Sequence, residues 1–256
     1  MEKRKITLYI TLLICVITIM AISFFNGNYK NVFMCILTLL LFLIPSILEK
    51  RLNIKLPTVL ECIIILFIFS AEILGEISGY YIKIPFWDTL LHTTNGFIMA
   101  AIGFSMIDIL NNSPRLHFNM SPVFVAFVSF CFSMTIGVLW EFFEYGMDII
   151  ALTDMQKDMI LQSISTVELN PQMINESIIF SDITKTIIES TANGTVTQTV
   201  IEGGYLDIGL RDTMNDLIVN CIGAVSFSII GVFYIKGRSL LAKNFIPELK
   251  TEDDEI

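Results

Sequence analysis

The stretch WDTLLHTTNGFIMAAIGFSMIDIL, residues 87–110, is apolar along most of its length but begins with strongly polar side chains. A helix that crosses a bilayer needs roughly 20 mostly apolar residues. Asp88, His92 and Asn95 are spaced i, i+4 and i+7, so a helix places them on one face. At about 1.5 Å of rise per residue, His92 lies about 6 Å further along the helix than Asp88. The stretch therefore predicts a transmembrane helix with a polar site at its beginning.

The rest of the chain has the same apolar character. Hydrophobic residues make up 54% of the 256 positions and charged residues 16%, which is typical of multi-pass membrane proteins rather than of soluble domains. We expect an all-α fold, a bundle of six transmembrane helices in a single membrane domain over residues 1–256. The predicted spans are about 6–26, 31–48, 58–77, 87–110, 121–145 and 212–235.

One connection, residues 149–211, is too polar and too rich in Ser, Thr and Asn to cross a membrane. We expect it to be an extracytoplasmic loop. Within it, residues 154–167 are predicted to form a short surface helix. Residues 184–191 and 195–201 flank Ala192-Asn193-Gly194, a pattern typical of a β-hairpin, and such a hairpin could cap the polar site.

The 16 Lys and Arg residues are distributed unequally between the two predicted membrane faces. Lys30, Lys83, Lys157, Lys185 and Arg211 flank one face, and all the others flank the face that holds both termini. Because cytoplasmic segments are enriched in Lys and Arg, we expect a cell-membrane protein with both termini in the cytoplasm. The net charge is −9 and no basic groove is apparent, so we expect membrane lipids as partners and no nucleic acid. The sequence does not indicate an oligomeric state.

Further strongly polar residues gather near the same membrane face as Asp88 on three other spans. They are Glu72 in the span 58–77, Glu141, Glu144 and Asp148 at the end of the span 121–145, and Asp212, Asp216 and Asn220 at the beginning of the last span. An ionisable group in hydrocarbon costs on the order of 3 kcal/mol or more, so their concentration favours a site with a cation, water or mutual partners. The simpler interpretation makes Asp88 and Asp212 helix caps and leaves Asp148 in water. Glu61, near the opposite face, is expected to extend its carboxylate to the interface.

Several carboxylates, two amides and one imidazole suit a divalent ion such as Mg²⁺, Mn²⁺ or Zn²⁺. The predicted metal ligands are Glu141, Glu144, Asp216 and His92, while Asp88 or His92 would move a proton as the catalytic group. The predicted supporting residues are Glu72, Asn95, Asp148, Asp212 and Asn220. No phosphate loop, nucleophile elbow or dinucleotide fingerprint is present in the sequence, so nothing favours covalent catalysis.

Three motifs carry a resemblance to known proteins: DxxxH at residues 88–92, WExxE at 140–144 and RDxxxDxxxNxxG at 211–223. Over about 87–225, the chain resembles the VanZ-like and YjdF-like families of bacterial membrane proteins. The positions that match those families are Asp88, His92, Glu141, Glu144, Asp212, Asp216, Asn220 and Gly223. Glu144, where VanZ-like proteins often have Gln, and the long loop before Arg211 make the resemblance closer to the YjdF-like family. The resemblance implies membrane residence and this polar site, and it implies no defined activity.

Three functional hypotheses remain open on the sequence alone. The first is a metal-dependent membrane hydrolase that acts on a lipid-linked or cell-envelope precursor from the outer leaflet. The second is a binding or transport protein whose carboxylates carry a proton or another cation. The third is a non-enzymatic envelope protein in which the polar network fixes helix packing and the long loop binds a partner.

Overall fold

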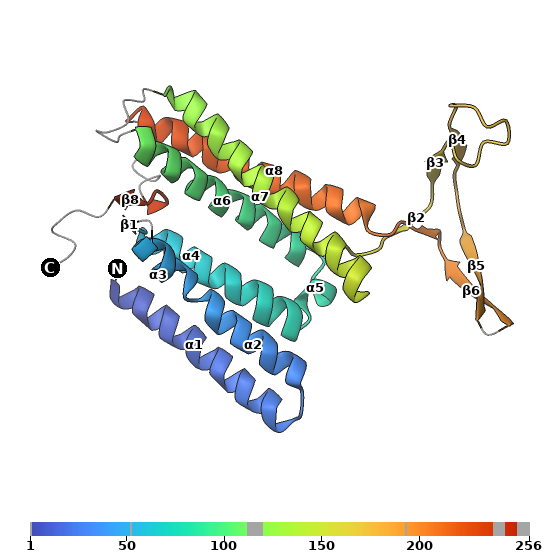
Figure 1. The fold of residues 1–256 in the computed structure, drawn as a ribbon, viewed down its shortest axis with the longest axis horizontal. Coiled ribbons are helices and arrows are strands. Elements are labelled where there is room, and N and C mark those ends of the chain that lie inside the picture. Colours follow the sequence, from blue (N-terminus) through green and yellow to red (C-terminus); the bar gives the residue numbers. More distant parts are fainter. Residues whose placement is uncertain (1, 52, 112–119, 193, 238–243, 250–256) are drawn as a thin grey trace. The chain divides into compact units, whose positions relative to one another are not determined.

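The computed structural model describes residues 2–51, 53–111, 120–192, 194–237 and 244–249. The chain forms two compact units, one of Met1–Leu139 with Asp216–Ile256 and one of Trp140–Asn215. Among the described residues, six helical stretches are long and apolar enough to cross a membrane. This finding confirms the predicted all-α class and its six transmembrane helices (Figure 1).

The first unit consists mainly of helices joined by short connections (Figure 1). They are α1 (Glu2–Phe25), α2 (Tyr29–Leu41), α3 (Ile44–Arg51), α4 (Thr58–Phe69), the π-helix η1 (Ser70–Ile77), α5 (Tyr80–Lys83), α6 (Trp87–Asn111) and parts of α7 (Pro122–Ala151) and α8 (Leu210–Ile235). The two-residue strands β1 (Ile54–Lys55) and β8 (Glu248–Leu249) pair antiparallel, so the C-terminal segment is tied to the connection between α3 and α4. α7 continues past residue 145, where the sequence pattern predicts its end, to Ala151.

Two of the membrane-spanning stretches are not uniform α-helices. Residues 29–51 form one candidate span, but the chain turns at residues 42–43 between α2 and α3, and the buried Pro45 lacks the backbone N–H that a continuous helix would use. α4 continues directly into the π-helix η1. The indole Nε1 of Trp87 donates a hydrogen bond to the carbonyl oxygen of Ser70, 3.3 Å away, at the start of η1.

An ion pair connects α1 to α4. Glu61 is 8% exposed, and its carboxylate pairs with the ammonium group of Lys5. The expectation that Glu61 extends to the interface is therefore wrong. The charge is compensated inside the bundle, because α1 packs against α4 and presents Lys5 at the depth of Glu61.

α6 and α8 approach closely because two glycines lie at their contact. A Cβ atom at Gly96 would meet the backbone carbonyl of Asn220 on α8, and one at Gly223 would meet the backbone carbonyl of Thr93 on α6. Neither backbone can move aside as a flexible side chain would, so any larger residue would separate the two helices. The two glycines thereby fix the register in which α6 faces α8.

Two hydroxyl groups of α7 donate hydrogen bonds to the backbone of α6. Ser133 donates a hydrogen bond to the carbonyl oxygen of Gly96 at 2.8 Å, and Ser129 donates to that of Ala100 at 2.6 Å. Both serines are fully buried. Further along α6, the fully buried rings of Phe104 and Phe227 meet edge to face with their centroids 5.8 Å apart. α6 therefore packs against both α7 and α8.

The second unit contains three antiparallel pairs of strands (Figure 1). β2 (Ile160–Leu161) pairs with β7 (Tyr205–Leu206), β3 (Ile164–Thr166) with β4 (Ile178–Phe180), and β5 (Lys185–Ala192) with β6 (Thr195–Glu202). The β5–β6 hairpin lies in nearly the same residues in which the sequence pattern predicts one. Its turn includes Asn193, which lies outside the described residues.

The helix predicted over residues 154–167 is wrong, because this segment contains β2 and β3. Its backbone N–H groups are bound by carboxylates that are distant in the sequence. The N–H groups of Met155 and Gln156 donate to Asp148, that of Lys157 donates to Asp212, and that of Met159 donates to Asp207. A helix would need these donors for its own carbonyl groups.

Candidate functional site

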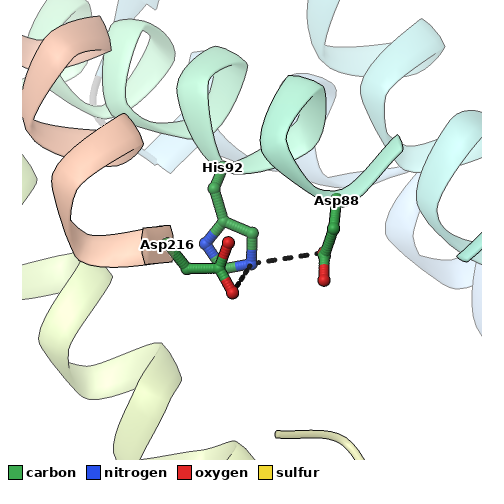
Figure 2. A group of neighbouring side chains, drawn as sticks. All are labelled: Asp88, His92 and Asp216. Carbon is green, nitrogen blue, oxygen red and sulfur yellow. Dashed lines mark ion pairs between the residues drawn. The ribbon is translucent and has the colours of Figure 1, made fainter. Parts of the chain in front are cut away.

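Three side chains from α6 and α8 converge in the first unit, and we call Asp88, His92 and Asp216 the acidic triad (Figure 2). Nε2 of His92 is 3.6 Å from Oδ1 of Asp88 and 3.8 Å from Oδ2 of Asp216. One potential ligand atom from each residue lies within 4.8 Å of the other two. Within the described part of the chain, no other set of His, Cys, Asp or Glu side chains has this spacing.

The sequence positions of the acidic triad follow from helix geometry and from the glycine contacts. Asp88 and His92 lie one turn apart, so they share a face of α6. Gly96 follows His92 by one further turn and contacts the backbone of Asn220, which follows Asp216 by one turn on α8. The close approach at Gly96 therefore brings the preceding turns of the two helices, and with them His92 and Asp216, to within ion-pair distance.

Burial differs across the acidic triad. The side chains of Asp216 and His92 are 5% and 9% exposed, whereas that of Asp88 is 20% exposed. A buried carboxylate and a buried imidazole strongly favour a partner of opposite charge or a bound cation, because charges transfer poorly out of water. The site is thus open on the side of Asp88 and closed by protein at Asp216.

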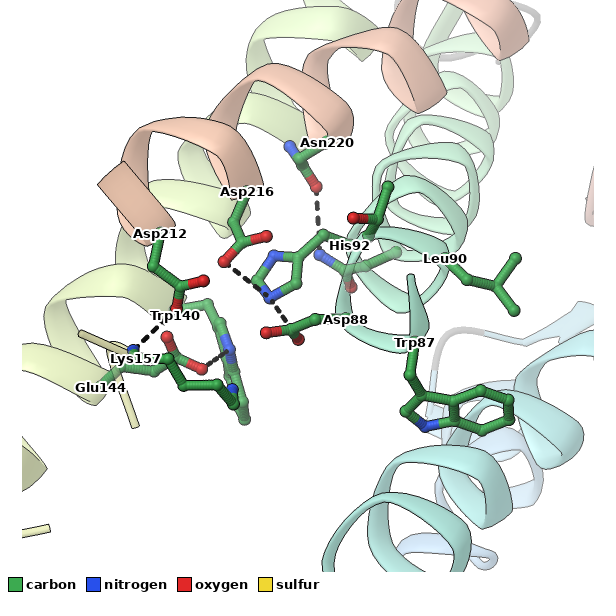
Figure 3. Close-up of polar contacts among 12 residues, drawn as sticks. Trp87, Asp88, Leu90, His92, Trp140, Glu144, Lys157, Asp212, Asp216 and Asn220 are labelled. Atoms are coloured by element: carbon green, nitrogen blue, oxygen red, sulfur yellow. Dashed lines mark hydrogen bonds and ion pairs between the residues drawn. The ribbon is translucent and has the colours of Figure 1, made fainter. Parts of the chain in front are cut away.

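A pair of amides lies one turn further into α6 and α8 (Figure 3). Nδ2 of Asn95 donates a hydrogen bond to Oδ1 of Asn220 at 3.3 Å, and the side chain of Asn220 is completely buried. The amide nitrogen of Asn220 also lies 3.7 Å from the sulfur of Met134 on α7. This amide pair therefore connects α6, α7 and α8 one helical turn from the acidic triad.

Glu141 and Glu144 lie in the part of α7 that belongs to the second unit. Both are buried, with 4% and 8% of their surface exposed. Oε1 of Glu144 accepts a hydrogen bond from the indole Nε1 of Trp140 at 2.8 Å (Figure 3). Protein therefore covers both carboxylates, which lie about one turn apart on α7.

Asp148 and Asp212 organise the chain that follows α7. Asp148 accepts hydrogen bonds from the hydroxyl of Thr153 and from the N–H groups of Met155 and Gln156, at 2.6–2.8 Å. Oδ2 of Asp212 accepts one from the N–H of Lys157 at 2.8 Å. Both carboxylates therefore have a structural function in closing this connection.

Glu72 lies in the π-helix η1, half-buried. Its Oε2 atom is buried and has no hydrogen-bond partner among the described residues. The residue is not part of the acidic triad. Nothing in its surroundings assigns it a role in the site.

Two contributors to the site were missed by the sequence pattern. Ser133 binds the carbonyl group of Gly96 one turn beyond His92, and Trp87 ties the start of α6 to η1 while its indole points away from His92 (Figure 3). A serine within an apolar span signals an interhelical hydrogen bond, so Ser133 could have been recognised. The Trp87 contact depends on the π-helix, for which the sequence contains no comparable signal.

Comparison with known proteins adds a family but no activity. Residues 7–237 match the family described as "Predicted membrane protein (DUF2238)". A protein of Thermotoga maritima described as "Uncharacterized protein" is 30% identical over 105 residues, which is 41% of this chain and 52% of that protein. The chain thus aligns with only about half the length of this relative. No solved structure matches the chain.

Proposed function

We propose that this chain, which belongs to the family of predicted membrane proteins DUF2238, binds a divalent cation within the membrane through Asp88, His92 and Asp216. The observation that supports the proposal is the convergence of one imidazole nitrogen and two carboxylates within 4.8 Å. Of the predicted ligands, the proposal keeps His92 and Asp216, and it adds Asp88.

The spacing of the acidic triad is close to that of a metal site. Ligand atoms bound to Zn²⁺ at about 2.0–2.2 Å and at tetrahedral angles lie roughly 3.4 Å from one another. The observed separations of 3.6 and 3.8 Å need only small side-chain rotations to reach that value. A mixed set of one nitrogen and two oxygen ligands suits Zn²⁺ or Mn²⁺ better than Ca²⁺, which prefers six to eight oxygen ligands.

Three protein ligands leave a coordination position open, as in catalytic rather than structural zinc sites. A divalent ion in such a site supplies a water molecule of lowered pKa and polarises an ester oxygen. Asp88 would hold the ion through one carboxylate oxygen and, on the open side of the site, keep the other oxygen to accept a proton. We therefore propose a hydrolase that acts on a lipid-linked or cell-envelope precursor. The same proposal includes three further points. The chain is related to the VanZ-like and YjdF-like families, its site faces the outer leaflet, and both termini lie in the cytoplasm.

Metal content is the direct test. Protein purified in detergent without metal-affinity chromatography should contain about one Zn²⁺ or Mn²⁺ per chain by plasma mass spectrometry. The variants Asp216→Asn and His92→Ala should lose the ion, while the control Asp182→Asn, which removes an exposed carboxylate of the second unit, should keep it. An unmodified protein that stays metal-free after incubation with either ion would refute the proposal. If the ion is present, release of phosphate or a headgroup from outer-leaflet lipids is the assay to follow.

A second function is favoured by one specific observation. Nε2 of His92 lies at similar distances from two carboxylates. The same arrangement suits an imidazole that binds a proton and an imidazolium that releases it. The protein would then couple proton movement to binding or transport. Proteoliposomes with a pH gradient would distinguish the two functions. If the protein is proton-coupled and contains no metal, it should take up protons along the gradient, and His92→Gln should abolish this uptake.

A further inference from the structure

The first unit contains an apolar pocket near the end of α6 opposite to the acidic triad. Its volume is about 220 Å³, and its lining is almost entirely apolar. The lining residues are Leu48, Ile54, Leu56, Ile102, Ser105, Met106, Ile109, Leu110 and Pro247. Small-molecule sites usually have volumes of about 300–1,000 Å³ and a few convergent polar groups, so this pocket fits a section of one flexible hydrocarbon chain better than a compact ligand.

The lining excludes a polar ligand inside the pocket. Its single hydroxyl, that of Ser105, already donates a hydrogen bond to the carbonyl oxygen of Ala101 at 2.8 Å. Polar groups that entered the pocket would lose their bonds to water without finding partners. A hydrocarbon chain would lose nothing, and it is the molecule most abundant around a membrane-spanning helix.

Positive charge flanks the pocket on the α3 side. The lining residues Leu48 and Ile54 are separated by the last turn of α3, which ends with the exposed Lys50 and Arg51. The acidic residue in this turn, Glu49, accepts a hydrogen bond from the N–H of Leu56 at 2.7 Å, so its carboxylate is directed into the connection. The turn therefore presents two cations beside an apolar pocket.

We propose that this pocket binds one anionic phospholipid, with part of an acyl chain in the pocket and the phosphate against Lys50 and Arg51. Lys and Arg near a membrane surface attract anionic headgroups, and guanidinium binds phosphate through two parallel hydrogen bonds. A zwitterionic lipid offers the same acyl chain but no net charge. The charge pair therefore selects the headgroup, while the pocket selects a lipid over a soluble phosphate.

The tie between β1 and β8 is consistent with a pocket that keeps its shape. Ile54 pairs in register with Leu249 and Lys55 with Glu248, which holds the wall formed by Ile54 and Leu56 against the C-terminal segment. Ile54 and Leu56 are themselves buried. The lipid would hence bind to a preformed surface rather than to a mobile loop.

Native mass spectrometry of the full-length protein in detergent tests the proposal, with palmitoyl-oleoyl phosphatidylglycerol and palmitoyl-oleoyl phosphatidylcholine as probes. We expect one phosphatidylglycerol per chain, and a phosphatidylcholine affinity about 25-fold weaker. The double variant Lys50→Gln/Arg51→Gln should weaken phosphatidylglycerol binding to the same level, because each of the two cations near an anionic headgroup contributes about a factor of five. The matched control Lys30→Gln/Lys83→Gln removes one cation from the beginning of α2 and one from the end of α5, and it should bind as the unmodified chain does.

Filling the pocket separates this site from general lipid contact. Ser105→Leu should reduce phosphatidylglycerol binding at least fivefold, and Leu110→Trp, at the partly exposed edge of the pocket, is a second variant if Ser105→Leu fails to fold. Free glycerol phosphate should not compete, whereas a soluble phosphate site would be blocked by it. Equal binding of the two lipids, or undiminished binding by both pocket variants, would overturn the proposal.

Discussion

Glu61 and the acidic triad both bury carboxylates in the first unit, and they differ in what faces these carboxylates. Glu61 on α4 faces the ammonium group of Lys5 on α1, a permanent cation with one charge for one charge. In the acidic triad, two carboxylates face one imidazole, whose charge depends on pH and which can bind a metal instead. The first arrangement is complete without a ligand, and it serves to join two helices. The second combines two carboxylates and one imidazole, a set of groups that can also bind a cation.

Loss of the proposed cation is the largest expected effect and would sharpen this contrast. Replacing Asp216 by Asn removes a charged ligand while keeping its size. We expect cation affinity to fall by more than about 100-fold, because even residues that only support a ligand change affinity 10- to 100-fold. Isothermal titration with Zn²⁺ and Mn²⁺ measures this effect. If Asp216→Asn bound either ion as well as the unmodified chain, the acidic triad would be an internal ion pair like that of Glu61.

Breaking the Lys5–Glu61 pair should destabilise the fold without affecting the cation. In Lys5→Gln the carboxylate of Glu61 stays buried without its ion pair, and we expect a loss of about 2–3 kcal/mol in the free energy of unfolding, below the full cost of a buried pair because Lys5 is partly exposed. Denaturation in detergent micelles measures the loss. Lys3→Gln, which changes an exposed residue of the same helix, is the control and should cost less than about 0.5 kcal/mol. Loss of metal in Lys5→Gln would show that the two places are not independent.

A glycine variant tests the close contact of α6 and α8 next to the acidic triad. Gly223→Ala would push α8 away from the backbone of α6 and should cost about 1–3 kcal/mol. It should also weaken cation binding, since Asp216 would move away from His92. Gly146→Ala on α7 is the matched control, because a Cβ there meets nothing within 4 Å and alanine favours a helix by about 0.5–1 kcal/mol. Equal stability of the two variants would contradict the packing described for α6 and α8.

A third type of carboxylate, bound by backbone N–H groups, gives the smallest effect. Burial raises the pKa of Asp207, but hydrogen bonds from the N–H groups of Met159, Arg211 and Gly209, with the charge of Arg211, lower it more, so the net pKa lies below its ordinary value. A lowered pKa stabilises the folded state above the ordinary value of about 3.8, and this contribution is lost as pH falls through the folded value.

We therefore expect the β2–β7 pair to open more easily below about pH 4, because it loses a contribution near 1 kcal/mol that Asp207→Asn already removes at higher pH. Hydrogen exchange of a peptide that covers residues 205–212, measured at several pH values and corrected for intrinsic rates, reports this opening. The control Asp182→Asn should leave the pH dependence unchanged. A pair that is equally protected at low pH in the unmodified chain would contradict the assignment.

The helices and two of the three residues of the acidic triad were predictable because both depend on local spacing. A run of apolar residues defines a span, and the i, i+4 spacing places Asp88 and His92 on one face whatever surrounds α6. The choice of Asp216 among the other acids was not predictable. It depends on the register of α8 against α6, which Gly96 and Gly223 determine through contacts between residues more than 120 positions apart.

The errors have the same cause. Residues 154–167 contain acceptable helix formers, but Asp148, Asp207 and Asp212 bind the N–H groups that a helix would use. Glu61 is an ordinary interfacial acid until α1 brings Lys5 beside it. In each case a contact between distant segments outweighs the local preference, and a single sequence contains no direct signal for such contacts.

The π-helix at Ser70–Ile77 determines where this chain can change its length. Each π-turn encloses one residue more than an α-turn, since its hydrogen bonds join residues i and i+5 rather than i and i+4. Deleting one residue there would let the segment continue as an α-helix with both ends in place. The same deletion between Asp88 and His92 would rotate one away from the other by about 100°. Relatives of this chain should consequently differ by single-residue insertions or deletions around 70–77, and keep a constant number of residues between 88 and 95.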